Sequence, residues 1–170
     1  SDPRLYQRDC ERAIQVIEVK TKIERSFPDI GDDELISCDR MVQVDPTWSD
    51  GYFQKSRIYF RVASARTNRG LDADAWFYKA IDSGYEAVKR NPADLNLYDF
   101  ITLSYAWLAH LETEKGRDPT PIQKKLIDSA QKQKDFHMTA VAHHQMGRYQ
   151  MQIGLDPTAD FDAALKEFEQ

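Results

Sequence analysis

The chain has 170 residues, enough for one domain with a sizeable core, and its 41% hydrophobic and 30% charged shares are those of an ordinary globular protein. The net charge of −5 argues against nucleic-acid binding, which needs a basic surface. No apolar run approaches the roughly 18 residues of a membrane span, so we expect no membrane insertion. The chain starts with Ser-Asp rather than Met and shows no signal-peptide core, which favours a segment cut from a longer protein.

Cys10 and Cys38 are the only two cysteines. A secreted domain of this size can use more of them as staples, so the count favours reduced thiols in a cytoplasmic protein. As thiols, both would act as small, half-buried hydrophobic side chains, and a disulfide or redox pair is the alternative.

The first 45 residues predict a divergent helix pair. Apolar residues recur at three- and four-residue spacing over 5–23, and alternating strand-like runs are absent from the sequence. We expect a first helix over about 4–25, a turn at the motif PDIGDDE, and a second helix over the motif ELISCDRMVQV.

The rest of the chain contains a repeat. The segments 52–84, 98–130 and 136–168 align without gaps, and their aromatic, small and apolar positions match in register. Such self-similarity is typical of helical repeat proteins, so each segment predicts a first helix, a short loop and a second helix.

The same loop recurs inside each repeat, as GLDADAW, GRDPTPI and GLDPTAD. Its glycine (Gly70, Gly116 or Gly154) is expected to end the first helix in the left-handed conformation. The aspartate two residues later can cap the second helix, and a proline can then take the first helical position, as at Asp118 and Pro119. With one glycine and an acidic residue, the loop does not match a phosphate-binding loop.

These repeats resemble the tetratricopeptide repeat (TPR) family. In that family a large residue, a small residue four later and an aromatic three further on mark the first helix, which fits Tyr52, Ser56 and Tyr59. The second-helix pattern of that family fits Ala80, Gly84, Ala87 and Pro92. The resemblance covers nearly the whole chain from about Asp33. The segment joining the two helices is longer than usual, which is similar to the TPR regions that follow the kinase domain in some bacterial serine/threonine protein kinases.

The resemblance implies an all-α fold, a right-handed superhelical solenoid of about four antiparallel helix pairs. We expect a single domain over residues 1–170, with units at about 4–45, 48–92, 94–132 and 135–170.

No set of residues typical of catalysis or metal binding occurs in the sequence. Kinase catalytic motifs and a nucleophile elbow are absent. His137 and His144 lie seven residues apart, without the i, i+4 spacing of a helical zinc site, and His143 takes an aromatic core position of the repeat. We therefore expect no enzyme activity, no metal and no cofactor.

The candidate binding residues lie on the first-helix face that lines the concave groove of a TPR stack. Arg57 and Arg61, one turn apart, could pair with an acidic peptide or phosphopeptide, although a solvated helix face is the more ordinary explanation. Trp107 suits either the groove or packing between repeats. The full predicted surface is Phe53, Arg57, Phe60, Arg61, Asp99, Leu103, Trp107, His137, Val141 and His144.

The function predicted is a non-catalytic module that binds a protein or peptide partner, regulatory or substrate-recruiting if it lies beside a kinase domain. A free-standing scaffold or chaperone-like TPR protein is one alternative. A self-associating homodimer is another, because the last motif, AALKEFEQ, has no polar capping helix after it.

Overall fold

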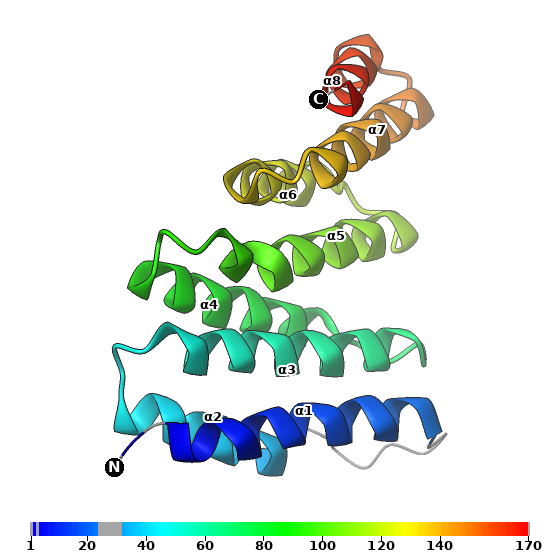
Figure 1. Cartoon of the computed structure of the whole chain (residues 1–170). Helices are drawn as coiled ribbons and strands as arrows, with labels where there is room; N and C mark the ends of the chain where they lie inside the picture. The colour runs from blue at the N-terminus through cyan, green and yellow to red at the C-terminus, as the bar shows by residue number, and fades with distance from the viewer. Residues whose placement is uncertain (1, 3, 24–31, 170) are drawn as a thin grey trace. The chain divides into compact units, whose positions relative to one another are not determined.

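The computed structural model describes residue 2 and residues 4–23 and 32–169, and it confirms the all-α prediction (Figure 1). No strand occurs in these ranges. The elements are α1 (Arg4–Ile23), α2 (Asp32–Val44), α3 (Ser49–Thr67), α4 (Asp74–Arg90), the 3-10 turn η1 (Leu95–Tyr98), α5 (Asp99–Glu114), α6 (Thr120–Gln133), α7 (Phe136–Gln152) and α8 (Thr158–Phe168).

The chain divides into two compact units, Ser1–Ile101 and Thr102–Gln170. The first unit contains α1 to α4, η1 and the first residues of α5, and the second contains the rest of α5 with α6 to α8. Each is described by itself below.

In the first unit, α1 and α2 are joined by a disulfide bond between Cys10 and Cys38. The prediction of reduced thiols is therefore wrong. Both cysteines are fully buried, in a core that also holds Ile14, Ile17 and Met41. Sequence counting missed the bond because it does not reveal that the two cysteines lie on facing sides of paired helices. The predicted turn between the helices lies largely outside the described residues.

In the same unit, α3 and α4 pack side by side as a helix pair (Figure 1). The Ser56 hydroxyl donates a hydrogen bond of 2.7 Å to the Ala80 carbonyl, and both residues are fully buried. A Cβ added at Gly84 would lie 3.2 Å from the Ser56 Oγ on α3, and 2.4 Å from the Ile101 Cγ1 on α5. The repeat pattern of small residues therefore sets how closely these helices approach.

In the second unit, polar and small residues hold the helices in a similar way. Thr102 on α5 donates to the Ser129 hydroxyl of α6 at 3.1 Å, and Ser129 donates to the Leu126 carbonyl at 2.9 Å. Between α7 and α8, the Phe161 ring lies against Gly147, with ring carbons 2.7 and 2.8 Å from where a Cβ would stand.

The three repeated loops have the structure that the sequence predicts. Gly70, Gly116 and Gly154 have φ of 69°, 68° and 77°. The amide of the residue after each glycine donates to the carbonyl five residues earlier, as from Arg117 to Glu112 at 2.8 Å, which is the pattern that closes a helix at a left-handed glycine.

The aspartates that follow these glycines cap the second helices. Asp118 Oδ1 accepts from the Thr120 amide at 2.9 Å, and Asp156 Oδ1 accepts from the Thr158 amide at 3.0 Å. Pro119, with φ −80° and ψ −10°, stands directly before α6, one position earlier than the first helical position that the sequence predicts.

Candidate functional site

The predicted surface residues of the first unit divide into packed rings and outer cations. Phe53 lies 5.4 Å from the Phe100 ring, and Phe60 lies 5.5 Å from that same ring. Phe60 is only 6% exposed, so it belongs to the core of this unit and offers a partner little surface. Arg57 is half-buried and Arg61 is exposed, on neighbouring turns of α3, while Asp99 is half-buried at the start of α5.

The predicted residues of the second unit lie nearer to solvent. Leu103 is 37% exposed on α5, and Trp107 is half-buried with its ring edge toward His110, at 6.1 Å between centroids. On α7, His137 and His144 are exposed and Val141 is half-buried. The His137 ring lies 6.0 Å from Phe168, so part of its surface packs on α8.

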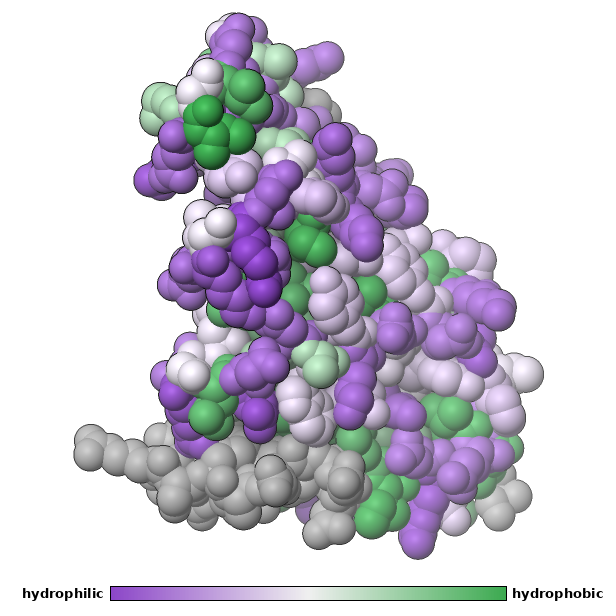
Figure 2. Space-filling view, turned by 180° about the vertical axis from the view of Figure 1, so that it is seen from behind, coloured by the Kyte–Doolittle hydropathy of each residue, from purple (hydrophilic) through white to green (hydrophobic). Residues whose placement is uncertain are grey.

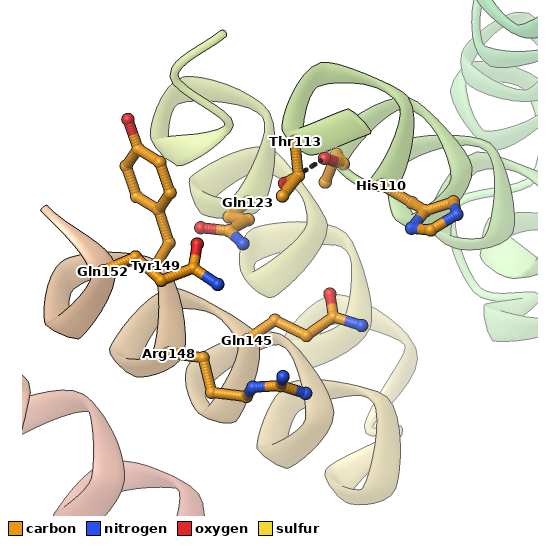
Figure 3. A pocket seen from close by; sticks show the side chains of 8 residues that line it. His110, Thr113, Gln123, Gln145, Arg148, Tyr149 and Gln152 are labelled. Carbon is orange, nitrogen blue, oxygen red and sulfur yellow. Dashed lines mark hydrogen bonds between the residues drawn. The ribbon is translucent and has the colours of Figure 1, made fainter. Parts of the chain in front are cut away.

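A pocket that sequence reasoning missed lies in the second unit (Figure 3). It has a volume of about 250 Å³ and is formed where the last turns of α5 and α7 pass the first turns of α6. Its lining consists mainly of polar side chains: Ala109, His110, Thr113, Gln123, Gln145, Arg148, Tyr149 and Gln152.

The second repeat lacks an aromatic pair that the other two have. Those rings occupy the equivalent place on the first and second helices of their own repeats: Phe60 with Phe77 at 6.0 Å, and His144 with Phe161 at 5.8 Å. In the second repeat the equivalent residues are Ala106 and Gln123. Of these two residues only Gln123 lines the pocket, so an amide replaces a phenyl group at its floor.

Gln123 is the most informative residue of the pocket. Its side chain is only 2% exposed, and its Oε1 is buried with no hydrogen-bond partner among the residues that the structure describes. Leaving such an acceptor without a partner costs about 1–3 kcal/mol, so buried polar groups of this kind usually have a water or ligand partner. In Figure 3 the Gln123 amide lies between Thr113 and Gln145, with its oxygen on the side of Tyr149 and Gln152.

Several of the other lining residues form hydrogen bonds or ion pairs with neighbouring residues. Thr113 donates to the Ala109 carbonyl at 3.0 Å, and His110 lies 3.2 Å from the Glu114 carboxylate. Hydrogen bonds from Thr120, from both its side chain and its backbone, lower the pKa of Asp118, and a hydrogen bond from Tyr149 adds to this effect. In Figure 3 the Tyr149 hydroxyl accordingly points away from Arg148.

Arg148 is the one lining residue with a fixed positive charge. It is exposed, and its guanidinium forms no ion pair within the described part of the chain. The pocket can therefore offer a cation at its rim and an amide at its floor.

The histidines do not assemble a metal site. In the ranges that the structure describes, no group of three or more His, Cys, Asp or Glu side chains could hold a metal ion. His143 instead contacts Asp160, with 2.9 Å between Nδ1 and Oδ1, and Gln150 donates to the other oxygen of Asp160 at 2.7 Å. This network ties α7 to α8.

Comparison of the chain with protein-family models, with curated proteins and with solved structures finds no match. Among the described residues, no helix has the length and apolar character needed to cross a membrane.

One sequence signal could have located the pocket. The loops beginning at Gly70, Gly116 and Gly154 fix the alignment, and the seventh residue after each glycine is Phe77, Gln123 or Phe161. A lone glutamine at a position that is otherwise phenylalanine indicates a local change in packing.

Proposed function

We propose that this chain is a non-catalytic interaction module that binds a protein or peptide partner through its first helices, α3, α5 and α7. The observation that supports this most strongly is that different residues of a first helix hold the helix pair together and face solvent. Small buried residues hold the two helices of a pair together, whereas α5 exposes Leu103 and α7 exposes His137 and His144, whose rings also lie near Phe168 and Phe161 of α8. A mixed polar and apolar surface of this kind suits protein contact.

The architecture that we propose with this function is a right-handed solenoid of about four helix pairs, similar to the TPR family. Its support is the repeated loop with its left-handed glycine and its capping aspartate, in three copies. Such a module could lie beside a bacterial serine/threonine kinase domain. It is equally compatible with a free-standing scaffold or a chaperone-like role.

The disulfide changes the compartment that we propose. Structural disulfides persist in oxidising environments and are rare in reducing ones. Because Cys10 and Cys38 are bonded and fully buried, we favour an oxidising compartment over the cytoplasm that the cysteine count predicted.

Selection of random displayed peptides against the purified chain tests the proposed function. We expect enriched peptides whose binding falls about tenfold or more in Arg57→Glu/Arg61→Glu or in Leu103→Glu/His144→Glu, because burying a new charge opposite a partner is costly. The matched control is Lys89→Glu/Lys132→Glu, which changes exposed residues of the second helices α4 and α6. Enriched peptides that bind all three variants as tightly as the wild type would refute the proposed face.

Self-association is a second candidate, favoured by an exposed apolar surface at the end of the second unit. Hydrophobic side chains gather there at the top of Figure 2, the end at which Figure 1 draws α8. The exposed residues of this end are Met151 (60%), Ile153 (51%), Leu155 (58%), Leu165 (63%) and Phe168 (56%). Size-exclusion chromatography with light scattering tests it: a monomeric mass at every concentration would eliminate this candidate.

A further inference from the structure

We propose that the pocket at the α5–α6–α7 junction is a specificity pocket for an acidic side chain of a bound peptide. Arg148 would pair with the carboxylate, and Gln123 would hydrogen-bond to the peptide backbone. The inference rests on the proposed interaction function and assigns a ligand chemistry to one part of it. The pocket lies in the last turns of the first helices, beyond the predicted contact residues Leu103, Trp107 and Val141.

The floor of the pocket favours a peptide group. A glutamine side chain carries a carbonyl acceptor and an amide donor. A peptide bond presents the complementary N–H donor and carbonyl acceptor, so the two can pair. Gln123 is only 2% exposed, and its side-chain carbonyl has no hydrogen-bond partner in the described part of the structure. A backbone N–H of a ligand would satisfy that carbonyl.

The rim of the pocket favours a single carboxylate. Arg148 is exposed at the edge of the pocket, on the far side of Gln145 from Gln123 in Figure 3, and a guanidinium can pair with a planar carboxylate through two N–H groups. The neighbouring acids already have partners, since Glu114 contacts His110 at 3.2 Å and Asp118 accepts from Tyr149. Phosphate recognition usually uses a cluster of arginines, and this pocket has one, so a singly charged glutamate or aspartate fits better than a phosphorylated residue.

The size of the pocket fits one side chain. A cavity of about 150 Å³ is already enough to hold a benzene molecule. The pocket, at about 250 Å³, can therefore take a glutamate side chain together with part of the adjoining backbone. Its volume is too small for a folded partner element, so the rest of a ligand would lie along the helices outside.

Amide NMR titration of the labelled chain tests the proposal with three probes: N-acetylglutamate N-methylamide, its glutamine analogue, and free glutarate. We expect the glutamate probe to shift amides of the pocket residues saturably. The glutamine probe should bind about tenfold or more weakly because it lacks the charge that Arg148 pairs. Glutarate should also bind more weakly because it lacks the peptide groups that Gln123 pairs.

Two variants separate the floor from the rim. Arg148→Gln should reduce binding of the glutamate probe to that of the glutamine probe. Gln123→Phe restores the residue type of the other two repeats, fills the pocket, and should abolish binding of every probe. Lys132→Gln removes a cation of the same unit that lies outside the pocket lining, so it should change nothing.

Several results would overturn the proposal: no saturable shift of the pocket amides, equal affinity for the glutamate and glutamine probes, or glutarate binding as tightly as the glutamate probe. Undiminished binding by a folded Gln123→Phe chain would do the same. If that variant does not fold, the probe comparison and Arg148→Gln decide. Selected peptides that bind α3, α5 or α7 while the glutamate probe fails would leave the proposed function standing and remove only this pocket assignment.

Discussion

Two glycines of this chain act through close packing inside helices rather than through a turn. Gly84 on α4 leaves room for Ile101, which is fully buried, and Gly147 on α7 leaves room for the Phe161 ring. Glycine in a helix normally costs about 1 kcal/mol relative to alanine. At both positions the lower helix propensity of glycine is therefore the consequence of a close approach between neighbouring helices.

Gly84→Ala tests this at the residue scale. The helix gains about 1 kcal/mol of propensity, but overpacking of a buried site costs about 1–3 kcal/mol, and the Ile101 Cγ1 at 2.4 Å from the new Cβ cannot move without disturbing the core. We expect a net loss of up to about 2 kcal/mol in the free energy of unfolding, measured by urea denaturation. In an Ile101→Ala background the same change should be neutral or stabilising, and an equal loss in both backgrounds would contradict a steric cause.

The sequence predicts the position of Gln123 in the repeat but not its environment. The sequence alignment gives its position, but the burial of its amide and the missing partner of Oε1 depend on how α5, α6 and α7 pack. Likewise, the periodicity places Phe60 on the same face as Arg57, and only the packed structure shows that Phe100 and Phe77 bury its ring.

At the scale of elements, the sequence was most informative at helix ends. Gly116, Asp118 and Pro119 each have one physical role that the residue type nearly dictates: left-handed closure, capping and a preset φ. These roles are local, so they can be predicted without knowledge of the rest of the fold. The disulfide depends on two helices meeting, and the sequence therefore left it as an alternative.

The capping aspartates predict a pH dependence. Hydrogen bonds from Thr120 and Thr158 lower the pKa values of Asp118 and Asp156 below the ordinary value of 3.8. A carboxyl with a lowered folded-state pKa stabilises the fold above its unfolded value, and this contribution is lost as the pH falls through the folded value. Asparagine caps a helix without titrating.

We therefore compare the wild type with Asp118→Asn/Asp156→Asn by thermal unfolding between pH 7 and pH 2. The free-energy advantage of the wild type over the variant should be constant near neutrality and shrink below about pH 4. An advantage that does not change across this range would show that the two carboxylates are not the titrating groups.

At the scale of the whole molecule, the disulfide stabilises one of two compact units. It links α1 to α2 across a separation of 28 residues and lies in the core of Ser1–Ile101. A crosslink of this kind typically contributes about 2–4 kcal/mol, mainly by restricting the unfolded chain.

Replacing both cysteines, in Cys10→Ala/Cys38→Ala, should thus lower the stability of the first unit by about 2–4 kcal/mol. Native-state hydrogen exchange measures the units separately. We expect faster exchange in α1 and α2 and little change in α7 and α8. Wild-type chain treated with a thiol reductant is the matched comparison, and uniform loss of protection in all helices would argue that the two units unfold as one.

The central claim is that α3, α5 and α7 present the binding surface. The most direct measurement is the amide NMR footprint of a peptide selected against the chain. The account predicts that the shifted amides lie on these three helices and, for acidic peptides, around Gln123 and Arg148. A footprint confined to α2, α4, α6 and α8, or the failure of every selection to yield a binding peptide, would contradict it.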